Sequence, residues 1–182
     1  MRMTKEAHGF MTASQRRSAI CLALEEAEQP LSATALAQQF SVTRQVVVGD
    51  IALLRAAGHD ISATPRGYLM QRPQTGLTRR IACRHSAAET AEELFAMVDC
   101  GCTVQDVIVE HPVYGQLTAP LQLSCRYDVE QYLARMGAAE ARPLSALTEG
   151  VHLHTVLAPD EAHLAQLRGS LARLGILLEE KD

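Results

Sequence analysis

The stretch Val42–Leu54, VTRQVVVGDIALL, has the pattern of a helix that buries one face and exposes its first turn. Thr43 suits the N-cap, because its hydroxyl can accept a hydrogen bond from one of the helix's unpaired N–H groups. Apolar residues then recur near helical spacing and can pack inward: Val46, Val47, Ile51, Leu53 and Leu54. Gly58 suits the left-handed position that follows a helix. The sequence therefore predicts a helix between Thr43 and Gly58.

Two shorter helices are predicted before this one, in the order of a helix-turn-helix. The first spans Ser14 to about Glu28, with Ser14 as its cap, and Pro30 breaks the pattern after it. The second spans Ala33–Gln39 with Ser32 as its N-cap. Two short strands, His59–Ser62 and Tyr68–Met70, are predicted to follow, with a turn between them. Three helices and a hairpin make a winged helix, which favours DNA binding; a three-helix interaction module is the alternative.

The first turn of a recognition helix and the tip of a wing are the places that meet bases and phosphates. The residues predicted to contact DNA are Thr43, Arg44, Gln45, Arg55 and Arg66.

Charge is divided unevenly along the 182 residues. Residues 1–72 carry eight Lys or Arg and six Asp or Glu, whereas residues 73–182 carry nine and fifteen. Nucleic acid is therefore a plausible partner for the first part alone. Because the basic excess is small, DNA affinity is expected to depend on a few well-placed arginines and on a homodimer.

Neither a membrane span nor a signal peptide is predicted. No apolar run approaches the ~18 residues that a span requires, and the start, MRMTKEAHGF, has no apolar signal core. We expect a cytoplasmic protein without a membrane partner. The cysteines are odd in number and irregularly spaced, which argues against a disulfide framework; they are Cys21, Cys83, Cys100, Cys102 and Cys125.

The chain is predicted to consist of a tail (1–13), the winged helix (14–72), a linker (73–77) and a second domain (78–182). In the second domain the patterns predict the order βαββαβα, with strands over 79–84, 103–110, 116–124 and 151–158 and helices over 87–98, 128–137 and 159–174. That order predicts an α+β fold with a mostly antiparallel sheet covered on one face by helices.

Histidines and a glutamate in this domain are candidate metal ligands. His152 and His154 lie two apart on a predicted strand and therefore share one face. His85 ends the first strand, and Glu93 lies in the helix that follows. Three imidazoles and a carboxylate suit Ni, Zn, Co or Fe. The alternative is a pair of half-exposed histidines on a solvated sheet face.

Three segments resemble the three-histidine domain of the niacin-responsive transcriptional repressors: RHSAAETAEEL (84–94), VDCGCTVQDVIVEHPVYGQL (98–117) and LTEGVHLHT (147–155). The resemblance covers about residues 14–182. It implies an HPr-like open-faced sandwich, a divalent metal (Ni, Zn or Fe) and nicotinic acid as co-repressor of genes for NAD biosynthesis or niacin uptake. It also implies that the metal ligands are His85, Glu93, His152 and His154.

The residues expected to hold nicotinic acid are His111, Tyr114 and Arg126. His111 precedes Pro112, which favours extended backbone and fixes its ring at a strand junction. The alternative for His111 is a turn histidine that is hydrogen-bonded to backbone. Arg84 is a further candidate for the carboxylate. Cys100 and Cys102 depart from the family pattern and are expected to be buried, reduced thiols.

The leading hypothesis is a dimeric, ligand-dependent repressor of double-stranded DNA operators, not an enzyme. Two alternatives stay open: a regulator for which the metal itself is the signal, and a metal-dependent enzyme domain tethered to a DNA-binding module.

Overall fold

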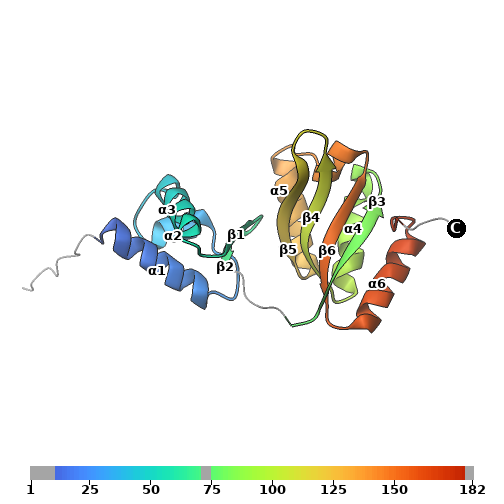
Figure 1. The fold of residues 1–182 in the computed structure, drawn as a ribbon, viewed down its shortest axis with the longest axis horizontal. Coiled ribbons are helices and arrows are strands. Elements are labelled where there is room, and N and C mark those ends of the chain that lie inside the picture. The colour runs from blue at the N-terminus through green and yellow to red at the C-terminus, as the bar shows by residue number, and fades with distance from the viewer. Residues whose placement is uncertain (1–10, 71–74, 179–182) are drawn as a thin grey trace, which may run out of the picture. The chain divides into compact units, whose positions relative to one another are not determined.

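The computed structural model describes residues 11–70 and 75–178, and the chain divides into two compact units, residues 1–72 and 73–182 (Figure 1). Most of the expected tail and part of the expected linker lie outside the described residues. Each unit is described by itself.

The first unit contains three helices and a two-stranded hairpin. The helices are α1 (Ala13–Glu26), α2 (Ala33–Gln39) and α3 (Arg44–Ala56), and the strands are β1 (Ile61–Thr64) and β2 (Gly67–Met70). The N-cap of α1 is Thr12 rather than Ser14, because Thr12 and Gln15 satisfy each other's backbone N–H groups in a capping box. The predicted winged helix is confirmed.

Helix α3 begins and ends as the sequence predicts. The Thr43 hydroxyl accepts from the Val46 backbone N–H at 3.3 Å, and Gly58 has φ +97° beyond the last turn. The buried face consists of Val47, Asp50, Ile51 and Leu54. Val46 and Leu53, which were expected to pack inward, are exposed.

The wing is fixed to the α1–α2 connection. Leu31 and Tyr68 exchange backbone hydrogen bonds of 2.9 and 2.8 Å. Gly67 allows this approach, since a Cβ atom there would lie 2.4 Å from the Leu31 carbonyl oxygen and φ is +144°. The first strand starts at Ile61 rather than His59, because the His59 N–H instead donates to Leu54 at the end of α3.

The second unit has the predicted order βαββαβα. Its strands are β3 (Leu77–Arg84), β4 (Thr103–His111), β5 (Gly115–Leu123) and β6 (Val151–Ala158). Its helices are α4 (Thr90–Asp99), α5 (Arg126–Ala138) and α6 (Glu161–Arg173), with short 3-10 turns at Ala87–Glu89 and Leu144–Thr148. The strands lie side by side in the order β3-β6-β4-β5, and every pair is antiparallel (Figure 1).

One core lies between the sheet and the helices. Alternate residues of β6 are buried, and Val156 and Ala158 pack in the same cluster as Met97 of α4, Val129 of α5 and Leu167 of α6. The same alternation turns His152 and His154 toward this covered face. The open-faced sandwich therefore places both histidines against the helix layer rather than in solvent.

The cysteines behave as expected. All five are free, and Cys100 and Cys102 are buried on either side of the turn from α4 to β4. Among the described residues no helix has the length and apolar character that a membrane crossing requires.

Candidate metal centre and DNA-contacting helix

Three imidazole rings surround one buried carboxylate in the second unit. The Nε2 atoms of His85, His152 and His154 lie 2.7, 3.0 and 3.3 Å from oxygens of Glu93. All four residues are less than a tenth exposed. The structure thus brings together the four residues that the sequence named as metal ligands.

Neighbouring elements determine where each of these side chains points. His152 and His154 lie opposite Cys83 and Ile81 of β3 in the antiparallel register, and His85 lies just beyond the end of β3. Glu93 is in the first turn of α4, where the positive end of the helix dipole stabilises a carboxylate. The centre therefore joins two strands and a helix.

Each of the three rings is oriented by a backbone carbonyl. The Nδ1 atoms lie 2.7 Å from Ser86 O, 2.9 Å from Gly150 O and 2.6 Å from Asp106 O, for His85, His152 and His154 in turn. Because a carbonyl only accepts hydrogen bonds, each Nδ1 must carry the proton. In the neutral rings the Nε2 lone pairs then face Glu93, which also only accepts. Because two acceptors cannot bond to each other, either a proton or a metal cation must lie between each Nε2 atom and the Glu93 carboxylate.

The charges at this centre shift the pKa values of its members. Burial alone would raise the pKa of Glu93, but the three histidines lower it far below its usual range. Burial alone would lower the pKa of His85 and of His154, but the hydrogen bond to Glu93 and its negative charge outweigh burial and raise both. The carboxylate is therefore ionised and attracts positive charge.

The donor set fits a first-row divalent metal. Three imidazole nitrogens and a carboxylate oxygen are common ligands of Zn, Ni and Fe. The carbonyl on each Nδ1–H fixes the tautomer and directs Nε2 inward, as at known metal sites. Sequence reasoning missed the Cys83 thiol, which lies within 4.8 Å of ligand atoms of Glu93 and His152. Its place opposite His152 in the sheet is set by strand pairing, which the sequence does not display.

Two cavities adjoin the centre. A small one of about 20 Å³ borders His152 and His154 and has room for about one water molecule. A groove of about 530 Å³ runs past His85 and Arg84. Ser145, in the turn before β6, lines both.

The residues predicted to hold nicotinic acid are not among those that line either cavity. His111 and Tyr114 lie together at the β4–β5 turn, where His111 Nδ1 accepts the Tyr114 N–H at 3.3 Å and the ring centroids are 4.9 Å apart. Arg126 forms two hydrogen bonds, of 2.7 and 2.6 Å, with the carboxylate of Asp99.

In the first unit, the start of α3 is open to solvent. Thr43, Arg44 and Gln45 are all exposed, as side chains that reach a major groove must be. The helix is attached to α1 through Asp50, which accepts from Arg16 at 2.6 Å and is 4% exposed. This contact connects α3 to α1 through a nearly buried ion pair.

The two other predicted DNA residues have contacts within the unit. Arg55 donates to the Ile61 carbonyl at 2.7 Å and lies over the Tyr68 ring. Arg66, in the turn of the wing, donates to Gln29 at 3.1 Å. Arg55 therefore stabilises the packing of the hairpin against α3, in addition to any contact that it makes with DNA.

Comparison with known proteins agrees with the description of both units. Residues 16–69 match an HTH domain, and residues 78–180 match the 3H domain. The chain is 42% identical over 166 residues to "Probable transcription repressor NiaR" of Thermotoga maritima, covering 91% of this chain and 95% of the relative. It is also 42% identical over 171 residues to "Transcription repressor NadR" of Bacillus subtilis, covering 92% and 95%.

These relatives are named as transcription repressors rather than as enzymes, and the tethered-enzyme alternative therefore has no support. The chain belongs to the 3H-domain family and, through its HTH domain, to the DNA-binding transcription repressors that these two relatives represent.

Proposed function

We propose that the second unit holds a divalent transition metal (Zn, Ni or Fe) on His85, Glu93, His152 and His154. The supporting observation is the set of three Nε2 lone pairs that face a buried carboxylate. The metal would supply a positive charge inside the domain and a coordination position for a further ligand. Elemental analysis of protein purified without a histidine tag tests this. One metal per chain is expected, and its retention in the double variant His152→Ala, His154→Ala would contradict it.

We propose nicotinic acid as the co-repressor. The groove beside His85 lies within the range of about 300–1,000 Å³ that is usual for small-molecule sites. It places Arg84, a partner for a carboxylate, next to a metal ligand. This groove is therefore a stronger candidate for the nicotinate site than the positions of His111, Tyr114 and Arg126.

Calorimetric titration of nicotinic acid into metal-loaded protein separates these two locations. Arg84→Ala is expected to weaken binding by at least about tenfold, since charge-assisted hydrogen bonds contribute about 1.5–3 kcal/mol. Arg126→Ala is the matched control and should leave the affinity unchanged. The reverse result, loss in Arg126→Ala or His111→Ala with Arg84→Ala unaffected, would place the ligand at the predicted residues instead.

We propose that a homodimer presents two α3 helices to operator half-sites, through Thr43, Arg44, Gln45, Arg55 and Arg66. Nicotinic acid would favour the arrangement of the two reading helices that matches the operator. Allosteric coupling of this kind amounts to about 1–3 kcal/mol, which tightens binding by about 5–150-fold. Genes of NAD biosynthesis or niacin uptake are the proposed targets.

Fluorescence anisotropy on the gene's own upstream DNA measures this coupling. Affinity is compared with and without nicotinic acid, at fixed salt and fixed free metal. Nicotinamide is the matched ligand that lacks the carboxylate. No change with nicotinic acid would refute the co-repressor proposal, and an affinity that follows free metal at fixed nicotinic acid would identify the metal itself as the signal.

A further inference from the structure

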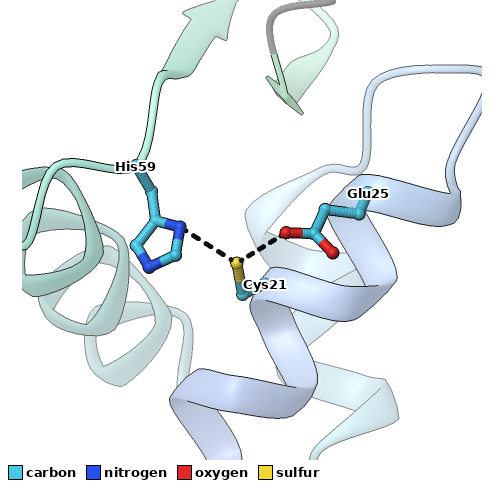
Figure 2. Close-up of side chains that lie close together, drawn as sticks. All are labelled: Cys21, Glu25 and His59. Carbon is cyan, nitrogen blue, oxygen red and sulfur yellow. Dashed lines mark hydrogen bonds between the residues drawn. The ribbon is translucent and has the colours of Figure 1, made fainter.

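Three side chains of the first unit meet at a point that the proposed DNA contacts do not use. Cys21 and Glu25 lie one turn apart on α1, and His59 lies in the segment between α3 and β1. The Cys21 Sγ atom is 3.3 Å from His59 Nδ1 and 3.4 Å from Glu25 Oε1. Figure 2 shows the three side chains pointing toward one another from two elements.

Two of the spacings match those within one coordination sphere: 3.3 Å from Cys21 Sγ to His59 Nδ1 and 3.4 Å from Cys21 Sγ to Glu25 Oε1. Donor atoms on a single tetrahedral zinc lie about 3.3–3.8 Å apart, as follows from Zn–S bonds of about 2.3 Å and Zn–N bonds of about 2.0 Å. Ligand atoms of Cys21, Glu25 and His59 all lie within 4.8 Å of one another. A thiolate, an imidazole and a carboxylate are also the three ligand types that zinc takes in proteins.

The surroundings leave room for a metal and a fourth ligand. Cys21 is 7% exposed, whereas Glu25 and His59 are exposed. A groove of about 430 Å³ opens at this point and is lined by all three residues. A metal can therefore enter from solvent, and water can complete the tetrahedron as in zinc sites with three protein ligands.

We propose that Cys21, Glu25 and His59 form a second metal site, for zinc or a similar thiolate-binding divalent ion, on the winged helix. The Cys21 thiol donates to Glu25. A bound metal would replace this proton, which would pass to solvent. The ion links the second half of α1 to the segment that leads into the wing, 38 residues later. Metal binding at this site would thereby stabilise the DNA-binding unit, independently of the centre at Glu93.

Cobalt substitution tests the site in the full chain, because a cysteine ligand gives a thiolate-to-cobalt charge-transfer band. The wild type is expected to bind two equivalents of cobalt per chain, one at Glu93 and one at Cys21, and to show the band. Cys21→Ser should bind one equivalent and lose the band, and Cys125→Ser, at an exposed free cysteine, is the matched control that should keep both. His154→Ala, which removes the centre beside Cys83, should lose the other equivalent and keep the band. Adding Cys21→Ser to His154→Ala should then abolish the band.

His59→Gln provides a second test that does not disturb the core, since His59 is an exposed residue outside the helices. This variant should also bind one equivalent and lose most of the band. In the His154→Ala background, zinc should slow amide hydrogen exchange at the end of α1 and near residue 59. Two equivalents and an unchanged band in both Cys21→Ser and His59→Gln would overturn the proposal, as would a wild type without the band.

Discussion

At the scale of single residues, Glu93 decides the chemistry of the second unit. Its side chain is 1% exposed and contacts three imidazoles whose Nδ1–H groups are already committed to carbonyls. An ionised carboxylate in such a place requires compensating positive charge. This single position therefore links the fold of the sheet to the proposed metal binding.

Glu93→Gln is expected to weaken zinc binding by about 100-fold or more, because it removes the anionic ligand while keeping the shape of the side chain. Above the raised pKa values of His85 and His154, the metal-free variant should be at least as stable as the metal-free wild type, since the new amide N–H donates to an Nε2 lone pair. Zinc titration and thermal unfolding measure the two effects. Wild-type zinc affinity in this variant would remove Glu93 from the ligand set.

The pH dependence of zinc binding follows from the same residues. His85 and His154 have pKa values raised above the ordinary 6.5, and protons therefore compete with zinc for Nε2 already near neutral pH. Zinc affinity should fall by about tenfold or more between pH 7.5 and pH 6. Calorimetry in buffers of different ionisation heat should detect proton release. A flat pH profile would contradict this prediction.

The stability of the metal-free chain should change with pH in the opposite direction to zinc affinity, decreasing as the pH rises. A histidine whose pKa is raised by folding stabilises the folded state most below its unfolded pKa. That contribution is lost as the pH rises through the raised value. Thermal unfolding in chelator should therefore show His85 and His154 stabilising the chain at pH 6.5 relative to pH 8.5, and the difference should shrink in His154→Ala.

At the scale of elements, much of the fold follows from local rules. Thr43 and Ser32 cap helices, and alternation along β6 puts both of its histidines on one face. The sequence cannot show which surface another segment covers. Val46 and Leu53 fit the apolar pattern of α3 yet stay exposed, because the packing of α1 and α2, rather than the spacing, selects the buried face.

Long-range contacts explain what sequence reasoning missed at the sites. Cys83 approaches the centre only because β3 pairs with β6, and His59 approaches Cys21 only because α3 packs on α1. The turn Leu144–Thr148 was not predicted, although it supplies Ser145 to both cavities. The four proposed ligands, His85, Glu93, His152 and His154, were named from their positions in the sequence. A two-residue histidine spacing alone is a weak signal, and the resemblance carried more weight.

The turn before β6 is expected to tolerate no side chain at Gly150. This glycine has φ +88°, and a Cβ atom would lie 2.1 Å from the carbonyl oxygen of His85. Gly150→Ala should lower the free energy of unfolding by about 2 kcal/mol or more and weaken zinc binding, because its own carbonyl orients His152. Chemical denaturation measures the first effect and zinc titration the second.

Gly137→Ala is the matched control. This glycine lies in helix α5 with nothing within 4 Å of its Cβ position. The substitution should leave zinc binding unchanged and stabilise the chain by up to about 1 kcal/mol. Equal stability of both alanine variants would contradict the argument about the turn.

Two arginines of α3 should separate DNA contact from stability. Arg44→Ala removes an exposed side chain and should weaken operator binding by about tenfold while leaving the unfolding free energy within about 0.5 kcal/mol. Arg55→Ala should lower stability, because its guanidinium holds the Ile61 carbonyl and covers Tyr68. Anisotropy at several salt concentrations and urea unfolding give the two readouts. Equal loss of stability in both variants would contradict this division.

At the scale of the whole molecule, the repressor proposal predicts a dependence on DNA geometry. Two half-sites on one face of B-DNA are separated by about 10–10.5 base pairs or a multiple of this. Inserting about 5 base pairs between the half-sites places them on opposite faces, and affinity should drop toward that of a single half-site. Inserting about 10 should restore part of it. Equal affinity for all three spacings would argue against a symmetric dimer.

The contact of Gly67 with Leu31 has a consequence for signalling. The hairpin is hydrogen-bonded near its turn to the connection between α1 and α2, and a Cβ atom at Gly67 would collide with the Leu31 backbone there. We therefore expect the β1–β2 hairpin to keep its position relative to α3. An effector bound in the sandwich domain would therefore act on DNA binding by moving the winged helix as one unit. A substitution that loosened the contact between Tyr68 and Leu31 would weaken this coupling without touching either binding site.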